Sequence, residues 1–362
     1  MRDYYIANSA STHSIKWYSV LQLLEVNPIW INRVFKEPRR PIFRLAFKVY
    51  EVVHIYLYLL FARVSVSGPI RVNVQYLGFY SIPLIFLPFR FSLISTVWGS
   101  DILINKYSFI KRALILLILK RSTIVTVDCN HILEALDDLH VHRAKVRFVP
   151  FGTNVRQFYY GLHHLESSFF KYSESNKCLF ISLRQLYRIY GVDEIIQAFE
   201  VFLDRYKLIF NSCPFAELHI YADGDQSEEL SSLINCKLLT SCVKMKGKFS
   251  YENLPNILQE YHYSISASHS DAGLSASIAE SMSSGVVPIV NDFGDNTHWV
   301  NESCGLVFQT GNVSNLADRM IEAYLISSDK YSNLSTEARK IVVSSLSEDS
   351  QLARLADIYS TL

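Results

Sequence analysis

The chain alternates short runs of β-branched and aromatic residues with longer stretches whose apolar positions recur every three or four residues. Short apolar runs bounded by turn residues are typical of buried strands, and the longer stretches are typical of amphipathic helices. Repeated alternation of the two predicts parallel sheets with crossover helices, and therefore an α/β fold. The predicted strands are 4–7, 72–77, 93–97, 124–127, 146–149, 178–182, 217–222, 243–246, 263–267, 287–290 and 306–308.

A length of 362 residues favours two domains over a single core. A turn with Pro150 and Gly152 leads towards the polar segment 171–177, where we place the linker. We expect a Rossmann-like domain over 1–160, a second over 175–340, and a C-terminal helix over 341–362 that crosses back to the first. The other predicted helices are 15–24, 41–63, 107–120, 130–139, 192–205, 227–234, 253–260, 276–284 and 313–326.

Composition excludes a disordered chain, because 49% of the residues are hydrophobic and 19% are charged. The formal charge is only +1, yet residues 1–120 carry +10 and the remainder carries −9. This asymmetry predicts that the first half makes peripheral contact with an anionic membrane. The alternative is a solvated basic face. The basic residues of the predicted contact are Arg33, Lys36, Arg39, Arg40, Arg44 and Lys48.

No stretch predicts a membrane span. Residues 52–62 are uncharged but too short, and the uncharged stretch 72–89 contains Pro83 and Pro88. The first residues lack the apolar run of a signal peptide, and no aromatic–basic motif indicates a nucleic-acid partner. We expect a cytoplasmic protein, because its scattered cysteines indicate free thiols and no metal site. They are Cys129, Cys178, Cys213, Cys236, Cys242 and Cys304.

The segment 264–296 has the most informative pattern. A strand ends at Ala267, a polar loop with Gly273 follows, and the next helix carries Glu280 and ends at Gly285. A glycine lets the backbone approach a ligand closely, and the start of the helix offers free N–H groups to a phosphate. The carboxylate of Glu280 is placed to accept hydrogen bonds from sugar or ribose hydroxyls. The alternative is that Glu280 only complements the helix dipole.

Five blocks of sequence resemble glycosyltransferase family 4, a group 1 family with the GT-B fold. The most specific is GLSASIAESMSSGVVPIV, residues 273–290. The others, in chain order, are NSASTHSIKW at 8–17, WGSDIL at 98–103, PFGTNVRQF at 150–158 and SLRQLYRIYGVDEIIQAF at 182–199. The resemblance implies two Rossmann-like domains that face each other across a cleft, with the donor in the second domain and the acceptor against the first.

The resemblance also implies what the donor site does. A nucleotide-diphosphate sugar is the donor, and its leaving group is stabilised without a metal or a further cofactor by arginine side chains and a helix N-terminus. Arg184 is placed for the first charge and Arg188 for the second. Arg184 and Glu280 are predicted to be catalytic. The predicted donor-binding residues are Arg184, Arg188, Asp271, Gly273, Leu274, Ser275, Glu280 and Asn296.

On the acceptor side the predicted residues are Ser9, His13, Trp98 and Asp101. Retaining members of the family react on one face, and the departing phosphate deprotonates the acceptor, so the resemblance calls for no dedicated protein base. His13 and Asp101 are nevertheless candidates for catalytic roles. Asp101 either orients the acceptor hydroxyl or caps the helix that follows it, and His13 is either structural or orients the acceptor.

Three positions depart from the family pattern. Ala272 stands where the family has its first signature acid, Ile189 where it has a lysine, and Gln185 where it has an arginine. The chain is interpreted as a retaining hexosyltransferase that acts on a glycan, one that is lipid-linked and belongs to cell-surface polysaccharide synthesis at the inner face of the cytoplasmic membrane. The alternatives are a non-catalytic subunit that binds nucleotide sugar and an enzyme like the nucleotide-sugar 2-epimerases.

Overall fold

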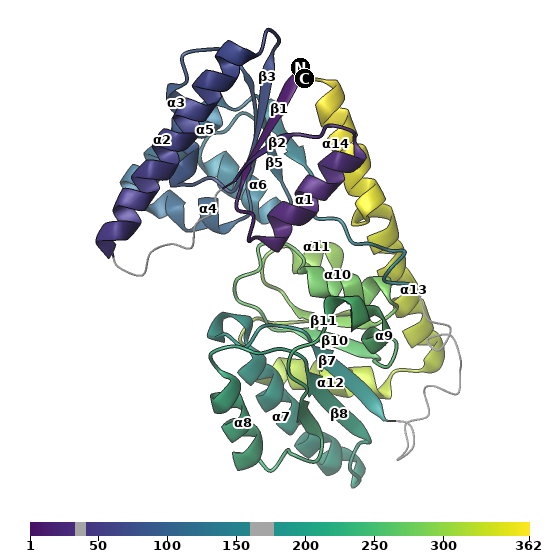
Figure 1. Ribbon diagram of the computed structural model, residues 1–362. Coiled ribbons are helices and arrows are strands. Elements are labelled where there is room, and N and C mark those ends of the chain that lie inside the picture. The colour runs from purple at the N-terminus through teal and green to yellow at the C-terminus, as the bar shows by residue number, and fades with distance from the viewer. Residues whose placement is uncertain (33–40, 160–176) are drawn as a thin grey trace. The chain divides into compact units, whose positions relative to one another are not determined.

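The computed structural model describes residues 1–32, 41–159 and 177–362. The chain forms two compact units, which share it unequally (Figure 1). The first unit comprises Met1–Pro150 together with Asp349–Leu362, and the second comprises Phe151–Glu348.

Each unit is built on a six-stranded parallel sheet, as the strand–helix alternation predicts. The strand order is β2-β1-β3-β4-β5-β6 in the first unit and β12-β11-β10-β7-β8-β9 in the second. The short strand β2 was missed by the sequence pattern. The strands are β1 Arg2–Ala7, β2 Ile29–Asn32, β3 Ile70–Gln75, β4 Ser92–Thr96, β5 Ile124–Val127, β6 Val146–Phe148, β7 Cys178–Ser182, β8 Ala216–Ile220, β9 Val243–Met245, β10 Tyr263–Ser266, β11 Val287–Asn291 and β12 Leu306–Phe308.

Helices connect the strands and cover the sheets, and each predicted helix from residue 15 to residue 326 has a counterpart. The helices are α1 Thr12–Leu23, α2 Pro41–Ser65, α3 Pro83–Phe86, α4 Ser100–Leu103, α5 Phe109–Arg121, α6 Asn130–Asp138, α7 Val192–Phe210, α8 Ser227–Cys236, α9 Leu254–Leu258, α10 Ala276–Ser283, α11 Asn296–Trp299, α12 Val313–Leu325, α13 Ser328–Ser345 and α14 Glu348–Ser360.

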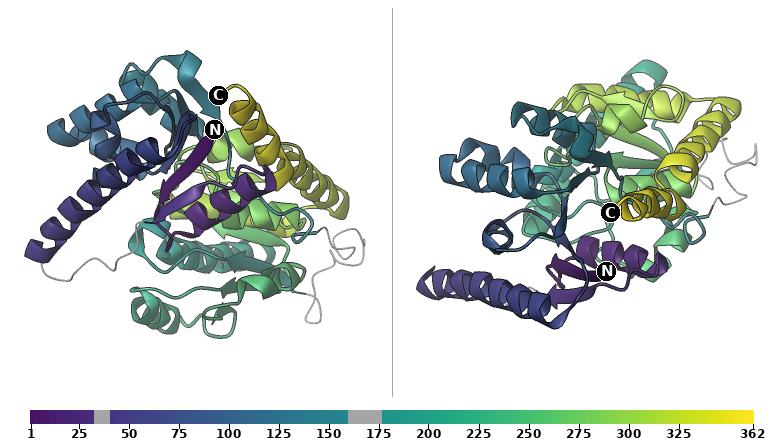
Figure 2. Two further views of the ribbon diagram at one scale, coloured as in Figure 1. Left: turned by 45° about the horizontal axis from the view of Figure 1, so that its top comes forward. Right: turned by 90° about the horizontal axis from the view of Figure 1, so that it is seen from above.

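Successive residues of β1 show how the first sheet is covered on both faces. The ring of Tyr4 lies 6.3 Å from that of Tyr58 on α2, whereas Tyr5 packs into a cluster with Trp17 and Leu21 of α1. Neighbouring side chains of a strand point to opposite faces, so α2 and α1 lie on different faces of the sheet. The views in Figure 2 agree, because α2 runs along one side of the first unit and α1 lies on the other.

The helix α14 belongs to the first unit although it follows the second along the chain. Leu355 and Ile358 join the Tyr5 cluster, Asn73 Nδ2 donates to Tyr359 Oη at 3.2 Å, and Arg71 stacks on the Tyr359 ring at 4.1 Å. Figure 1 shows α14, in yellow, beside α1 and close to the N-terminus.

The predicted single helix over 341–362 is wrong. Its first residues are the end of α13, and α14 begins only at Glu348. The break arises because Ser347 pairs with Thr153 in an isolated parallel bridge, and Glu348 N donates to Thr153 O at 3.0 Å. These bonds take the backbone at Ser347 out of the helical pattern. The change of unit therefore falls between residues 348 and 349.

The second sheet is also buried on both faces. Phe180 of β7 packs with Phe199 and Phe202 of α7, whereas its neighbour Ile181 packs with Leu254 and Leu258 of α9. A parallel sheet covered in this way is expected to have strands that are apolar throughout, and β7 and β11 fit that expectation.

Within the described residues, no helix combines the length and apolarity that crossing a bilayer requires. Of the predicted basic contact, Arg33, Lys36, Arg39 and Arg40 lie outside the described residues.

Gly191 is held between α7 and β10, and we expect this position to reject alanine. Its φ is +62°, and an added Cβ would lie 2.5 Å from Ala267 O. Gly191→Ala is expected to lower the free energy of unfolding by about 3 kcal/mol, from left-handed strain plus overpacking. Gly247 is the matched control, because its φ is +71° and nothing lies within 4 Å of an added Cβ. Gly247→Ala should cost only about 1 kcal/mol in chemical denaturation, and equal losses would contradict the clash.

Candidate functional site

The second sheet reverses its strand order between β7 and β10, which are neighbours although 80 residues of chain separate them. Strands added after β7 extend the sheet on one side, and those added after β10 extend it on the other. Loops that leave two such strands diverge, and in open α/β sheets ligands are expected to bind at the carboxyl ends of the strands at such a point. The loop 183–191 follows β7 and the loop 267–275 follows β10, and the predicted donor residues lie mainly on these two loops.

Arg184 joins the two loops. Its Nη2 lies 2.8 Å from Asp271 Oδ2 and 2.9 Å from Oδ1, and its guanidinium carbon lies 4.4 Å above the centroid of the Tyr190 ring. Among the described residues Arg184 Nε has no hydrogen-bond partner, although it is buried. The guanidinium is therefore held in one plane with donor capacity to spare, which suits recognition of a phosphate.

Arg188 does not lie with Arg184 on the same carboxylate. Its Nη2 pairs with Glu229 Oε1 of α8 at 3.1 Å, and its side chain is 80% exposed. Ile189, at the position of the family's lysine, is exposed and uses its carbonyl to accept from His269 N at 2.8 Å. The structure thus brings only one of the two predicted cations to Asp271.

The loop 267–275 is positioned by close backbone contacts. Gly294 has a φ of +58°, and a Cβ there would lie 2.4 Å from Asp271 O and 2.6 Å from Ala272 O. Asp295 N donates to Ala272 O at 2.9 Å. The carbonyl of Ala272 is thus used by the next loop of the sheet, which fixes the position of the neighbouring Asp271.

The loop ends at the N-terminus of α10. Gly273, Leu274 and Ser275 are half-buried, and Ser275 is the N-cap residue with an extended backbone. Its hydroxyl makes no capping bond and lies 3.4 Å from the hydroxyl of Ser277. The first turn of α10 therefore lacks a side-chain cap and presents its N–H groups to an anion.

Glu280 lies inside α10 and is only 5% exposed. Its Oε1 accepts a hydrogen bond of 2.6 Å from the hydroxyl of Tyr251. Burial, and then the charge of Glu280, raise the pKa of Tyr251 well above its usual value. The carboxylate already accepts from a hydroxyl, the role the sequence predicts towards a sugar or ribose.

Asn296 is buried, and its Nδ2 donates to Asn291 O at 3.1 Å and to Asn291 Oδ1 at 3.0 Å. Asn291 in turn donates to Ser268 O at 2.9 Å. The amide nitrogen of Asn291 therefore ties β11 to the loop after β10, and the amide nitrogen of Asn296 holds Asn291 in place.

An ion pair and two tyrosines at this edge of the sheet were missed by sequence reasoning. His269 Nε2 lies 2.6 Å from Glu194 Oε1, which ties the loop after β10 to the first turn of α7. Tyr190 contacts Arg184 and Tyr251 contacts Glu280, two of the predicted catalytic residues. Their only signal was the aromatic character of the surrounding sequence, which the hydrophobic core explains equally well.

In the first unit the predicted acceptor residues lie on loops after β1 and β4. Ser9 lies in the turn between β1 and α1, and His13 is exposed at the start of α1. The centroid of the Trp98 ring lies 5.4 Å from those of both His13 and Trp17. Trp98 and His13 thus form an aromatic wall at the carboxyl ends of the strands.

A buried polar network fixes Trp98. Its Nε1 donates to Gln75 Oε1 at 3.1 Å, and Gln75 Nε2 donates to Asn73 Oδ1 at 2.7 Å and to Thr96 Oγ1 at 3.0 Å. Asn73 continues to Tyr359 on α14. Each bond satisfies a group that would be costly to bury unpaired, so the network defines the position of the Trp98 ring.

Asp101 is fully buried, and its carboxylate accepts from Leu77 N at 2.9 Å and from Trp98 N at 3.1 Å. It lies within α4, so the predicted capping role gives way to a bond between two loops. Burial raises its pKa to about 7 against the opposing effect of the two N–H donors. Its carboxylate is closed off from an acceptor, so Asp101 is a positioning residue.

The chain is similar to known glycosyltransferases in sequence and in fold. Residues 166–341 match the family model of glycosyl transferases group 1, which spans most of the second unit and supports a glycosyltransferase. The two parallel sheets with their helices match structures of the GT-B fold. No curated protein sequence matches the chain.

The similar structures share little sequence. HepE of Anabaena in complex with UDP has a TM-score of 0.75 at 12% identity, with 100% of each chain covered. Sucrose-phosphate synthase of Thermosynechococcus elongatus has 0.73 at 12% identity and covers 100% of this chain and 99% of its own. The lipopolysaccharide outer core galactosyltransferase WaaB has 0.72 at 11% identity, with 100% of each chain covered.

The high pKa of Asp101 predicts a pH-dependent stability. An unfolded aspartate ionises near pH 4, whereas folded Asp101 keeps its proton to about pH 7. Folding therefore takes up a proton between these values, and the free energy of unfolding should fall by up to about 4 kcal/mol as the pH rises from 4 to 7, then level off.

Urea denaturation at several pH values measures this effect against Asp101→Asn, which cannot ionise. The difference in the free energy of unfolding between the wild type and Asp101→Asn should shrink as the pH rises from 4 to 7. Asp357→Asn, on the exposed side of α14, is the control and should run parallel to the wild type. Parallel curves for Asp101→Asn would show that the buried carboxyl ionises normally.

Proposed function

We propose that the protein is a metal-independent, retaining hexosyltransferase of family 4 that transfers a sugar from a nucleotide-diphosphate donor to a glycan acceptor. The observation that carries the proposal is Arg184, held by Asp271 and Tyr190 where the strand order of the second sheet reverses. The match of the same unit to group 1 glycosyl transferases supports it.

Arg184 and the N-terminus of α10 stabilise the leaving group. As the bond from the sugar to the diphosphate breaks, negative charge grows on the phosphate oxygens. The guanidinium donates to these oxygens in place of Asp271, and Tyr190 keeps it oriented. The uncapped first turn of α10 adds backbone N–H groups. One such preorganised donor is typically worth about 3 kcal/mol of the barrier.

Glu280 binds a hydroxyl of the donor. Its Oε1 already accepts from Tyr251 at 2.6 Å, so the carboxylate is oriented and desolvated before a donor arrives. A ribose or sugar hydroxyl takes the place of the Tyr251 hydroxyl. This exchange conserves the number of hydrogen bonds, which limits the cost of displacing Tyr251.

The family resemblance implies that the departing phosphate removes the proton from the acceptor hydroxyl. The first unit then has to position the acceptor. The Trp98 and His13 rings offer a flat apolar surface to a sugar ring, and Asp101 holds the Trp98 loop through its two N–H bonds. Leu274 and Ser275, with the backbone at Gly273, contact the donor sugar where Ala272 replaces the usual acid.

The acceptor is proposed to be lipid-linked, in cell-surface polysaccharide synthesis at the inner face of the cytoplasmic membrane. The +10 charge of residues 1–120 supports this, as do the exposed apolar side chains Tyr50, Val53, Leu57 and Phe61 along α2. Similarity to WaaB and to HepE, solved with UDP-glucose, favours a UDP-sugar and a surface glycan.

A second candidate is a non-catalytic subunit that binds nucleotide sugar. Two observations favour it: Arg188 pairs with Glu229 instead of Asp271, and Ala272 supplies no carboxylate. Hydrolysis of the donor by the purified protein separates the enzyme from the subunit. The linkage of the product separates a transferase from an epimerase.

Thermal unfolding with UDP, GDP, ADP and CMP tests the donor site. At 100 times its dissociation constant, one nucleoside diphosphate should stabilise the protein by about 2.7 kcal/mol and raise Tm by several degrees. Arg184→Ala and Glu280→Ala should abolish the shift. Arg205→Ala, which breaks an exposed ion pair of the same unit, should preserve it.

The same measurement in excess EDTA should give an unchanged shift, because Arg184 and α10 are proposed to bind the phosphates without a metal. A shift that requires Mg²⁺ would contradict metal independence. A folded protein that responds to none of the nucleotides would favour neither the enzyme nor the binding subunit.

Removal of the charge on Asp271 tests its relation to Arg184. Asp271→Asn frees the guanidinium from a half-buried ion pair worth about 1 kcal/mol, so a nucleoside diphosphate should bind about fivefold more tightly. Titration calorimetry measures the change, with Asp318→Asn as the control for an exposed ion pair. Weaker binding would instead mean that Asp271 contacts the donor.

A further inference from the structure

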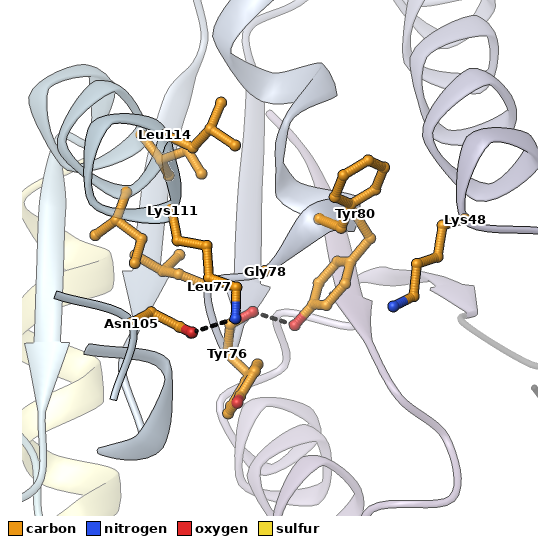
Figure 3. A pocket seen from close by; sticks show the side chains of 11 residues that line it. Lys48, Tyr76, Leu77, Gly78, Tyr80, Asn105, Lys111 and Leu114 are labelled. Atoms are coloured by element: carbon orange, nitrogen blue, oxygen red, sulfur yellow. Dashed lines mark hydrogen bonds between the residues drawn. The ribbon is translucent and has the colours of Figure 1, made fainter. Parts of the chain in front are cut away.

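A pocket of about 300 Å³ lies in the first unit, between α2, the 3₁₀ turn η1 (Phe79–Ser81) and α5 (Figure 3). We call it the α2–α5 pocket. Its floor is apolar and buried, since Leu77, Ile115 and Ile118 are each no more than 4% exposed. The lining residues are Lys48, Tyr76, Leu77, Gly78, Phe79, Tyr80, Asn105, Lys111, Leu114, Ile115 and Ile118.

Two lysines give the pocket a positive charge. In Figure 3 the amine of Lys48 points towards Tyr80 and the amine of Lys111 reaches Asn105. The distance from Lys111 Nζ to Asn105 Oδ1 is 3.0 Å. No carboxylate lines the pocket within the part of the chain that the structure describes, and Glu51, the only acid of α2, is buried outside the lining. Two ammonium groups without a lining counter-ion favour an anion.

Exposed apolar side chains continue from the pocket along the same elements. Phe79 is 45% exposed, and Tyr107 and Phe109 before and at the start of α5 are 83% and 89% exposed. Large aromatic side chains next to lysines are typical of surfaces that meet lipid. The part of a bound apolar ligand that extends out of the pocket thus has further apolar surface of this unit to pack against.

The pocket also adjoins the acceptor loops. Leu77 lines it and donates its N–H to Asp101, whose carboxylate also holds the N–H of Trp98. A residue that lines the pocket is therefore connected through Asp101 to the loop of Trp98, whose ring forms an aromatic wall with His13.

We propose that the α2–α5 pocket binds an amphiphilic anion, a phosphate or diphosphate ester of a long hydrocarbon chain, with Lys48 and Lys111 on the phosphate and the first carbons of the chain on Leu114, Ile115 and Ile118. The proposal rests on the proposed function in one respect, because it assigns this ester as the lipid end of the glycan acceptor. The sugar that follows the phosphate then lies towards Trp98.

Decyl phosphate, kept below its micelle concentration, is the probe, and titration calorimetry of the full chain measures its binding. It should bind at least tenfold more tightly than decanol or inorganic phosphate, because each of these lacks one half of the recognition. Each methylene that enters the pocket should strengthen binding about fourfold, as expected for burial of a CH₂ group. Equal binding of decanol, or of inorganic phosphate, would overturn the proposal.

Variants test the assignment residue by residue. Lys48→Ala and Lys111→Ala should each weaken decyl phosphate about tenfold through a lost charge-assisted bond. Leu114→Trp should fill the pocket and abolish binding. Lys120→Ala, on the exposed face of α5, is the matched control and should bind normally. If Leu114→Trp fails to fold by circular dichroism, the comparison of Lys48→Ala with Lys120→Ala decides alone, and equal affinities there would overturn the proposal.

Vesicles of phosphatidylglycerol and phosphatidylcholine separate the acceptor ester from a bilayer headgroup. Co-sedimentation of Lys111→Ala and Leu114→Trp should remain within twofold of Lys120→Ala, because the pocket takes the acceptor and not the bulk lipid. Loss of vesicle binding with decyl phosphate binding unchanged would assign the lysines to the membrane surface and overturn the proposal.

Nucleotide binding distinguishes failure here from failure of the proposed function. The pocket variants should give the same thermal shift with nucleoside diphosphate as the wild type. A wild type that binds decyl phosphate and no nucleotide would leave the pocket standing and remove the transferase. A wild type that binds nucleotide but not decyl phosphate would leave the proposed donor site standing and overturn the proposal for the pocket.

Discussion

The pairing of β7 with β10 is the constraint on which the chemistry of the second unit depends. It puts next to each other two strands that are remote in sequence, and the loops after them diverge because the sheet is extended on either side. Gly191 packs against Ala267 at this point, an approach that a side chain would prevent. The ion pair of Arg184 with Asp271 then bridges the two loops. The strand pairing therefore determines where the two loops lie, and the side chains of Arg184 and Asp271 then join them.

The first unit uses the same principle with different chemistry. Its sheet reverses between β1 and β3, and the segments after these strands carry His13, at the start of α1, and Leu77, in the floor of the α2–α5 pocket. Here neutral and weakly acidic groups do the positioning: Gln75 orders Trp98, and Asp101, whose pKa is near 7, joins two loops. The second unit instead places charged groups on the loops after β7 and β10. These differences fit the proposed diphosphate donor and the proposed acceptor with an apolar end.

Local pattern was sufficient to predict most of the fold. Strands such as β5 and β7 are short, apolar and bounded by turn residues, so their limits are visible in the sequence. The strand β2 was missed because four residues after Pro28 show no period of their own and are held by pairing with β1. The break between α13 and α14 was missed for a related reason, since it depends on Thr153, far away in sequence.

The positions of the candidate site residues on strands, loops and helices were predictable, but the contacts of these residues were not. The sequence pattern predicted Arg184 directly after a strand and Glu280 inside the helix that follows Gly273, and the structure has both in these positions. The local sequence does not show that Tyr251 donates to Glu280 or that Arg188 pairs with Glu229. It also does not show that Asp101 is buried and accepts from Leu77 N. Each of these depends on a contact between segments that are distant along the chain. Burial then decides the charge of a group such as Asp101, and burial is a property of the assembled unit.

The return of α14 to the first unit affects the order in which the protein is made. During synthesis an N-terminal domain usually folds first, as a unit. Here all of 151–348 is translated before Leu355, Ile358 and Tyr359 exist to cover Tyr5 and complete the polar network from Asn73. Until α14 is made, part of the core of the first unit stays exposed to water. By then all six strands of the second unit have been translated. The unit whose residues are all translated first is therefore the one that starts second along the chain.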